Sequence, residues 1–425
     1  MEYAKLGRGE LLSLKNDVQK EYDLLKGKGL SLNMSRGKPA PEQIDDSDGL
    51  LTVLTSSEEA KKNGDYRNYG LLEGIPEMRA LFAEIFDVPA KNVLACGNSS
   101  LNLMYDAVMR GYVFGVGEGK TPWGKQGKIK FLCPCPGYDR HFAVTEEFGF
   151  ELIPVKMTPT GPDMDEVETL VRDPAVKGIW CVPKYSNPTG VTYSDETVRR
   201  LASLRPAADD FRIFWDNAYY VHPIYPERDE KLLNIFTEAH KAGNDDIFYE
   251  FSSTSKITYP GGGVSCIIAS DANIAFIKKH LSIQTISYDK INQLRHVLYF
   301  KTAENLKKHM IGQASHLRPK FETVENAFTK ELSGLGIAEW THPAGGYFVS
   351  LDVLDGTAKR VHALAKDAGV TLTSPGATYP YKNDPRDRNL RIAPSYPSTE
   401  ELRSAMEILC CCVRLAALEK LTENN

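Results

Sequence analysis

The sequence has no long uninterrupted run of apolar residues. None approaches the ~18 residues that a helix needs to cross a bilayer, and Met1–Lys5 begins no apolar segment of the kind found in signal peptides. We therefore expect a cytoplasmic protein with no membrane partner.

Charge of one sign is also lacking. Lys and Arg total 51 against 56 Asp and Glu, which gives a formal net charge of −5, and no basic stripe or tail is present. Proteins that bind nucleic acid usually concentrate positive charge on one face or in a tail. The composition therefore predicts no nucleic-acid partner.

Cysteine is scarce and poorly spaced for cross-linking. The eight cysteines include Cys133-Pro134-Cys135 and the run Cys410–Cys412, and neither spacing matches a disulfide framework or paired C-x-x-C zinc motifs. Because unpaired cysteines are often small core residues, we expect reduced, mostly buried thiols and no metal site.

The length and the hydrophobic pattern favour two domains. At 425 residues the chain exceeds the size at which one core keeps growing. Apolar segments alternate with helical stretches such as 75–86, 101–112, 163–171 and 194–204, which is typical of an α/β fold with a mostly parallel sheet between helices. Seven strands are predicted, near 92–95, 128–133, 151–155, 178–182, 211–215, 246–251 and 264–269.

A second, smaller α+β domain is expected from the two ends of the chain. The amphipathic helix predicted over 8–26 has no evident partner in the large domain. A long helix over 290–331 would connect the domains. The C-terminal part then contains predicted strands at 346–351 and 389–393 and helices near 359–368 and 399–418. We assign 1–45 and 316–425 to the small domain and 46–315 to the large domain.

Three polar residues follow predicted strands. Lys256 ends the hydroxyl-rich turn Phe251–Lys256, Asn187 follows 178–182, and Asp216 ends the apolar strand 211–215. Open α/β sheets bind ligands at the carboxyl ends of their strands, so these side chains should meet. A partly desolvated lysine has a lowered pKa, and its neutral amine can form a Schiff base with a carbonyl group. A solvated loop lysine is the ordinary alternative.

The segment Gly97–Ser100 is a candidate phosphate site. A short predicted strand turns there directly into a helix, so backbone N–H groups and hydroxyls are free to bind an anion. Asn or Ser at such a point is also an ordinary N-cap. This segment alone leaves both interpretations open.

An ordered set of motifs carries a family resemblance. The set is Asn68-Tyr69-x4-Gly74, Gly97–Ser100, Pro136–Tyr138, Asn187–Gly190, Asp216–Tyr219, Ser253–Lys256 and Asn389–Arg391. In this order they resemble the class I aminotransferases of pyridoxal-phosphate fold type I, and among them a bacterial subgroup of aspartate aminotransferases. The resemblance spans about residues 30–395.

The resemblance implies roles around pyridoxal 5′-phosphate. Lys256 would form the Schiff base and move the substrate proton, and Asp216 would pair with the pyridinium N–H. Asn187 and Tyr219 would hydrogen-bond the phenolic oxygen. Tyr138 would stack on the ring, with Cys135 the alternative by spacing. The residues implied to hold the phosphate are Gly97, Asn98, Ser99, Ser100, Ser253, Ser255 and, from the second subunit of a homodimer with shared active sites, Tyr69.

The substrate would be held from the small domain. Arg391 would bind the α-carboxylate with its planar fork, beside Asn187, and the loop at Gly37 would close over the substrate. Two departures from the family pattern stand out. The segment 257–264 lacks the usual phosphate-binding arginine, so its glycines would offer backbone amides. The segment 282–290 lacks an arginine for a distal carboxylate, for which Arg36, Lys38 and Lys290 are the candidates.

The predicted activity is amino transfer between aspartate or glutamate and 2-oxoglutarate or oxaloacetate, by a ping-pong Schiff-base mechanism. An aminotransferase or lyase for another amino acid would use the same sites. A non-catalytic pyridoxal-phosphate-binding sensory module is the alternative of another class, and it predicts an attached DNA-binding segment that the sequence does not show. His141 and His222 are interpreted as supporting or core histidines.

Overall fold

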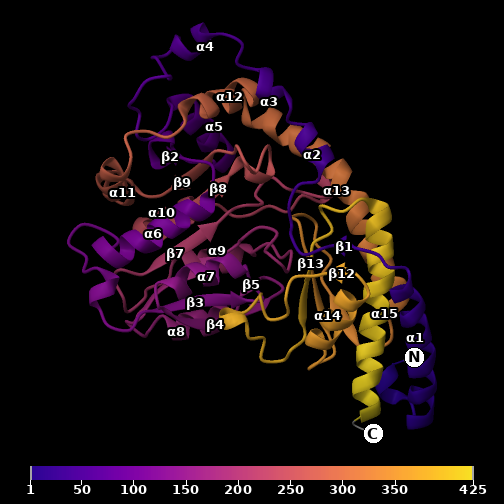
Figure 1. Cartoon of the computed structure of the whole chain (residues 1–425). Coiled ribbons are helices and arrows are strands. Elements are labelled where there is room, and N and C mark those ends of the chain that lie inside the picture. The colour runs from indigo at the N-terminus through magenta and orange to yellow at the C-terminus, as the bar shows by residue number, and fades with distance from the viewer. Residues whose placement is uncertain (1, 424–425) are drawn as a thin grey trace.

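An eight-stranded mixed sheet forms the centre of the molecule (Figure 1). The computed structural model describes residues 2–423. The strand order is β2-β9-β8-β7-β6-β3-β4-β5, parallel from β8 to β4, with β9 antiparallel to β2 and β8, and β5 antiparallel to β4. The strands are β2 (Val93–Ala95), β3 (Lys130–Cys135), β4 (Glu151–Thr158), β5 (Gly161–Pro162), β6 (Val176–Cys181), β7 (Arg212–Asp216), β8 (Phe248–Ser253) and β9 (Ser265–Ile268). The seven predicted strands are confirmed, and only the two-residue β5 is additional.

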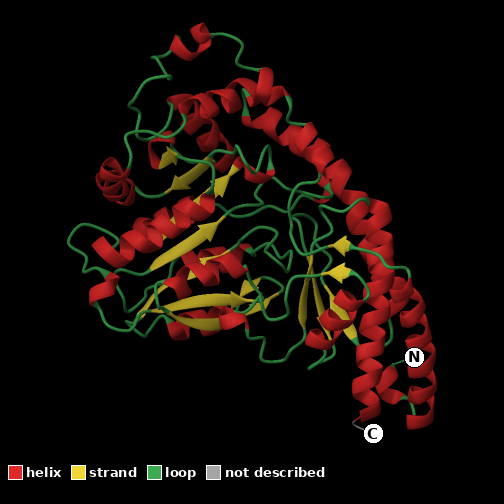
Figure 2. Cartoon of the chain, in the orientation of Figure 1, coloured by secondary structure: helices red, strands yellow, loops and turns green. Residues whose placement is uncertain are grey.

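Helices cover both faces of this sheet (Figure 2). Along β7, Phe214 packs toward one face, while Ile213 and Trp215 pack toward the other. This alternation follows from the two-residue period of a strand and produces two apolar layers. The helices around the sheet are α5 (Pro76–Phe86), α6 (Ser100–Phe114), α7 (Asp139–Glu147), α8 (Met164–Leu170), α9 (Asp195–Ala202), α10 (Ile235–Lys241) and α11 (Asp271–Gln284).

The two ends of the chain share one core, which also includes Val182, Tyr185, Tyr219 and Ile224. Leu11 of the first helix, Leu351 of a small sheet and Cys410–Cys412 of the last helix belong to one buried cluster, and α1 runs beside α15 (Figure 1). All eight cysteines are buried and unpaired, as predicted. The elements are α1 (Arg8–Gly27), β1 (Leu32–Asn33), β10 (Ala338–Trp340), β11 (Val349–Val353), α14 (Ala358–Asp367), β12 (Val370–Thr371), β13 (Asn389–Ile392) and α15 (Thr399–Glu423).

The prediction of one helix over 290–331 is wrong. The segment forms two helices, α12 (Lys290–Phe300) and α13 (Ala303–Leu332). Lys301 has a φ of 65°, which ends α12, and the Thr302 side chain accepts a hydrogen bond from Asn305 N to begin α13. The apolar periodicity continues through both helices and therefore hides the break.

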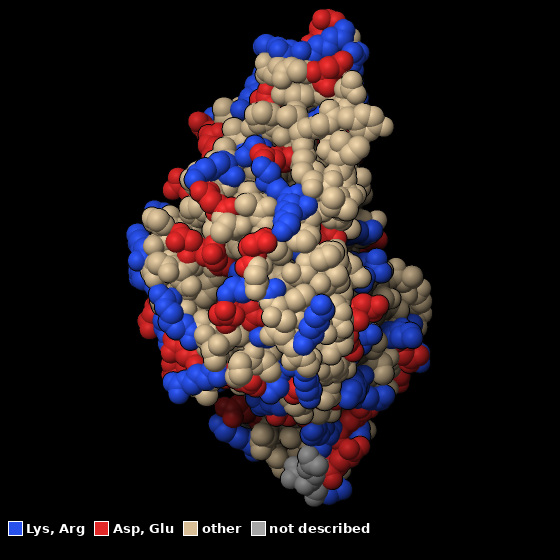
Figure 3. Space-filling view, turned by 90° about the vertical axis from the view of Figure 1, so that its left-hand side faces the viewer, with Lys and Arg blue, Asp and Glu red and all other residues tan. Residues whose placement is uncertain are grey.

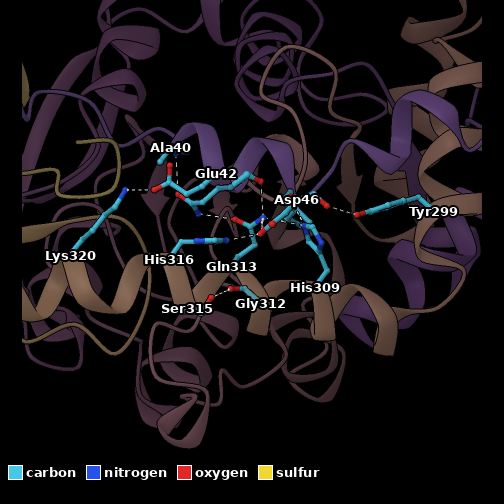
Figure 4. Close-up of polar contacts among 12 residues, drawn as sticks. Ala40, Glu42, Asp46, Tyr299, His309, Gly312, Gln313, Ser315, His316 and Lys320 are labelled. Carbon is cyan, nitrogen blue, oxygen red and sulfur yellow. Dashed lines mark hydrogen bonds and ion pairs between the residues drawn. The ribbon is translucent and has the colours of Figure 1, made fainter. Parts of the chain in front are cut away.

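Polar contacts attach the N-terminal segment to α13. Three short helices follow β1, namely α2 (Pro41–Asp45), α3 (Gly49–Thr52) and α4 (Ser57–Lys61). Lys320 Nζ donates to Glu42 Oε1 at 2.9 Å, and His316 Nε2 lies 2.9 Å from Asp46 Oδ2 (Figure 4). These contacts fix the far end of the loop that contains Gly37.

The surface carries mixed charge. Acidic and basic side chains are interspersed over the face shown in Figure 3. Within residues 2–423, no helix combines the length and the apolar character needed to cross a membrane.

Candidate active site

A cavity of about 180 Å³ lies where β6, β7 and β8 end. The parallel register explains this position, because Asp216 at the end of β7 is paired with Phe251 on β8, shortly before Lys256. Sequence-predicted residues from several elements meet here: Gly37, Ser99, Ser100, Tyr138, Asn187, Asp216, Tyr219, Ser253, Ser255 and Lys256 line the cavity.

Lys256 is the one cation among the described residues that line the cavity. It ends the 3₁₀ turn Thr254–Lys256, and its Nζ lies 5.0 Å from the centroid of the Tyr219 ring. Burial lowers the pKa of the Lys256 amine, and the nearby Asp216 carboxylate opposes this. The effect of burial is the larger one, so the Lys256 amine is more easily neutral, and therefore more nucleophilic, than the amine of an exposed lysine.

The backbone of Lys256 is held by two buried side chains. Its carbonyl accepts hydrogen bonds from His222 Nε2 and from the Tyr347 hydroxyl, both at 3.3 Å. Burial lowers the pKa of His222 to about 3, so this imidazole is neutral at physiological pH. His222 therefore supports the lysine, in line with its interpretation from the sequence. Nothing in the sequence singles out Tyr347 as a supporting residue, except that it lies within the predicted strand 346–351.

Asp216 is 3% exposed and half satisfied. Its Oδ2 lies 2.8 Å from His141 Nε2, while Oδ1 has no hydrogen-bond partner among the described residues. The His141 ring is itself stacked on Trp180, with centroids 4.4 Å apart. A buried carboxylate oxygen without a donor is costly. It fits a ligand that presents an N–H group from the cavity.

The N-terminus of α6 forms the other end of the cavity. Ser99 is the N-cap and its side chain makes no cap hydrogen bond, so the first N–H groups of the helix remain free for an anion. Gly97 and Asn98 do not line the cavity. Their carbonyls instead accept hydrogen bonds from Ser265 N and from Ser255 Oγ, at 2.7 and 2.9 Å. These two residues support the turn rather than face the cavity.

The loop after Lys256 leaves little room for a side chain at Gly263. A Cβ there would lie 3.0 Å from both the backbone nitrogen and the Oγ of Ser255. Asn292 Nδ2 donates to the carbonyls of Gly262 and Gly263, at 2.8 and 3.0 Å. The segment 257–264 lacks an arginine, and the close packing of Ser255 explains why its residue 263 is a glycine.

Arg391 lies one layer behind the cavity wall. Its Nη1 donates to Asn187 Oδ1 at 3.4 Å, and its Cζ lies 5.0 Å above the Phe348 ring, both residues of the cavity lining. A Cβ on Gly37 would lie 2.3 Å from Phe348 Cζ, which requires glycine there. Arg391 Nη1 also donates to Asp139 Oδ1 at 2.7 Å. Sequence reasoning missed Asp139, although it directly follows Tyr138.

Several predicted residues do not line the cavity, among them Arg36, Tyr69 and Lys290. Arg36 is exposed and Tyr69 is 81% exposed. Lys290 is buried, and its amine donates to the carbonyls of Asn68 and Gly70. Lys290 is therefore occupied by the turn that presents Tyr69, and the suggestion that it binds a substrate carboxylate is wrong.

A second buried carboxyl group lies on β8, at Glu250, which is paired in register with Trp215. Glu250 on β8 is 4% exposed, and its Oε1 accepts a hydrogen bond from Asn217 Nδ2 at 2.8 Å. Burial raises the pKa of Glu250 from 4.5 to about 7. The folded state thus keeps a proton that the unfolded chain loses near pH 4.5, so the free energy of unfolding falls as pH rises from about 4.5 through about 7.

We expect Glu250→Gln to remove this pH dependence. Glutamine keeps the acceptor oxygen but cannot ionise, so the variant should gain stability relative to the parent between pH 5 and pH 8, by at most about 3 kcal/mol. Thermal unfolding of both proteins across this range measures the difference. Glu118→Gln, at a residue whose side chain is 81% exposed, should show no such trend. Parallel curves for Glu250→Gln and the parent would contradict a raised pKa.

Comparison with known proteins gives the family. A profile of the family described as aspartate amino-transferase matches residues 6–425. The chain belongs to this family. It is a class I aminotransferase, as the ordered motifs predicted.

Relatives match over nearly the whole chain. The aspartate aminotransferase of Corynebacterium glutamicum is 47% identical over 404 residues, which cover 95% of this chain and 93% of that protein. A putative aminotransferase of Mycolicibacterium smegmatis is 47% identical over 425 residues, covering 99% of both. The crystal structure of an aspartate transaminase from C. glutamicum superposes with a TM-score of 0.96 at 44% identity, covering 99% of both chains. The predicted α/β fold is thereby confirmed.

Proposed function

We propose that this aminotransferase uses pyridoxal 5′-phosphate to exchange amino groups between aspartate or glutamate and their 2-oxo acids. The observation that carries the proposal is the unpartnered Oδ1 of Asp216, in the wall of the same cavity as Lys256. Asp216 Oδ1 can accept a hydrogen bond from a ring N–H, and the Lys256 amine can form a Schiff base with an aldehyde. The name of the C. glutamicum relative supports the choice of aspartate.

The cavity residues fit this cofactor. When bound, it supplies an electron-accepting ring that stabilises negative charge at the substrate Cα. Asp216 Oδ1 would accept the ring N–H, and Lys256 would hold the cofactor and carry the substrate proton. The free N-terminus of α6, with Ser253 and Ser255, would bind the phosphate. A Thermus thermophilus aminotransferase of the same fold, 21% identical with a TM-score of 0.73, is described in complex with a phosphopyridoxyl-leucine.

Two tyrosines and an amide would complete the ring site. Burial raises the pKa of Tyr219 well above its usual value, so its hydroxyl stays protonated and can donate to a phenolate oxygen. Asn187 would donate to the same oxygen through its amide, while its Oδ1 faces Arg391. Tyr138, whose pKa burial raises to about 12, would lie against the ring.

The substrate would be bound from the side of the small sheet. Arg391 on β13 would take the α-carboxylate, and Gly37 and Phe348 would cover it. Arg36, exposed on the loop beside Gly37, is our candidate for the distal carboxylate. We assign 1–45 and 316–425 to a small domain that closes on 46–315, so that water is excluded from the reacting carbon.

We infer that two chains share each active site. Tyr69 is 81% exposed, and Ile283 and Ile286 are 89% and 61% exposed, so a second chain that covered them would remove apolar surface from water. A second copy covering them would bring its own Tyr69 to the phosphate. Sedimentation velocity should give the mass of two chains, and a fully active monomer would refute the shared site.

The decisive assay follows oxaloacetate. Purified protein supplied with pyridoxal 5′-phosphate, aspartate and 2-oxoglutarate should form oxaloacetate and glutamate in equal amounts, and tyrosine or 2-aminoadipate should be poorer donors. Transfer from those donors but not from aspartate would refute the dicarboxylate specificity. The absence of transfer from all three would refute the proposed reaction and favour a lyase or a non-catalytic module.

A further inference from the structure

Arg391 has one strong partner, and it is not a substrate. Its guanidinium is buried, with the residue 8% exposed. Nη1 donates to Asp139 Oδ1 at 2.7 Å and to Asn187 Oδ1 at 3.4 Å, and Nη2 donates to Thr373 Oγ1 at 3.4 Å. Nε has no partner among the described residues. The one charge that balances this buried cation is therefore the Asp139 carboxylate.

Asp139 is placed so that it can leave this pair. It is the first residue of α7, and its side chain is 33% exposed. An acid in the first turn is stabilised by the helix dipole, with or without the arginine. Arg391 differs in this respect. If Asp139 moved away while no substrate was bound, Arg391 would remain as a buried charge without a counter-ion. The pair should therefore persist until another carboxylate arrives.

Arg391 Nη1 has two N–H groups and already donates to Asp139 Oδ1 and Asn187 Oδ1, so a substrate carboxylate that binds Nη1 has to displace one of them. Two carboxylates on one guanidinium nitrogen would repel each other, and both prefer the short, charge-assisted geometry that Asp139 has now. We propose that Asp139 is an internal competitor of the substrate: it neutralises Arg391 in the empty site and is displaced by the α-carboxylate, which weakens substrate binding. This inference rests on the proposed role of Arg391 as the carboxylate clamp.

Removing the charge of Asp139 should tighten substrate binding. Asp139→Asn keeps the size and an acceptor oxygen but competes less, so the Kd of 2-oxoglutarate for the holoenzyme should fall about two- to fivefold, as expected for the loss of a partly exposed ion pair. KM should fall in parallel while kcat changes less than about twofold. Asp139→Glu, which retains the charge, should bind more like the parent than Asp139→Asn does.

Calorimetric titration with 2-oxoglutarate tests the proposal. Asp165→Asn is a matched control, because Asp165 also lies in the first turn of a helix and pairs with an arginine, Arg200, at 2.6 Å. Its Kd should equal that of the parent. A higher or unchanged Kd for Asp139→Asn would overturn the proposal, since Asp139 would then only position Arg391 or be without effect.

Arg391→Ala separates the two hypotheses. If this variant binds 2-oxoglutarate as tightly as the parent, the clamp itself is wrong and the proposed substrate site fails. If Arg391→Ala weakens binding and Asp139→Asn does not strengthen it, only the competition fails. Weakened binding in the first variant and tighter binding in the second support both.

Discussion

Lys256→Ala should abolish covalent attachment of pyridoxal 5′-phosphate and lower kcat by at least ~10⁴-fold, the scale on which loss of a catalytic nucleophile or base acts. No other lysine or arginine in residues 2–423 lines the cavity, so no second amine is available to replace it. The fold should survive, because the Lys256 backbone is held through its carbonyl by His222 and Tyr347 and not through its amine.

Reduction with borohydride measures the attachment directly. After digestion, mass spectrometry should find the phosphopyridoxyl group on the peptide that contains Lys256 in the parent and on no peptide in Lys256→Ala. Lys279→Ala, which removes an exposed lysine paired with Glu118 at 3.0 Å, should retain the label and the turnover. A label on another lysine, or turnover near the parental rate in Lys256→Ala, would show that Lys256 is not the attachment site.

The part of the site that lies at the strand ends could be predicted from the sequence. Asp216 and Lys256 follow apolar segments whose type and length predict buried parallel strands, and parallel strands end at one edge of a sheet. The structure pairs Asp216 with Phe251, shortly before Lys256, and the side chains of Asp216 and Lys256 line the same cavity. The strand pattern, together with the rule that ligands bind at the carboxyl ends of parallel strands, was therefore enough to predict that these groups meet.

Contacts across the packing of separate elements were beyond the sequence. Asp139 and Arg391 are 252 positions apart, and they meet only because β13 of the small sheet packs near the start of α7. His141 was expected to support the site, but its partner was not named, although Asp216 clearly needed one. Such pairs depend on side-chain directions that no local pattern encodes.

Local geometry explains the remaining differences. The break between α12 and α13 depends on one residue, Lys301, whose positive φ leaves no mark on apolar periodicity. Gly263 shows the converse. The sequence shows that the segment 257–264 lacks an arginine, but it does not show that Ser255 lies 3.0 Å from the position of a Cβ on Gly263. A one-dimensional pattern records which residue is present but not the neighbour that requires it.

Asp216→Asn should lower kcat by about 10²–10⁴-fold while the protein remains folded. The asparagine oxygen can still accept from His141, which leaves the amide NH₂ where Oδ1 now is. A donor at that place cannot hold a proton on the ring nitrogen, so the ring loses its positive charge and much of its capacity to accept electrons. Loss of a buried, charge-assisted contact costs about 3–5 kcal/mol, at 1.36 kcal/mol per tenfold in rate.

Kinetics must be separated from stability for this substitution, because any buried aspartate is costly to change. Asp210→Asn is the matched control: Asp210 is 3% exposed and pairs with Lys177 at 2.7 Å, outside the cavity. We expect both variants to unfold at lower temperature than the parent, but only Asp216→Asn to lose turnover and to release pyridoxal 5′-phosphate more readily on dialysis. Equal losses of turnover in the two variants would mean that Asp216 acts through stability alone, and a parental rate in Asp216→Asn would remove it from the reaction.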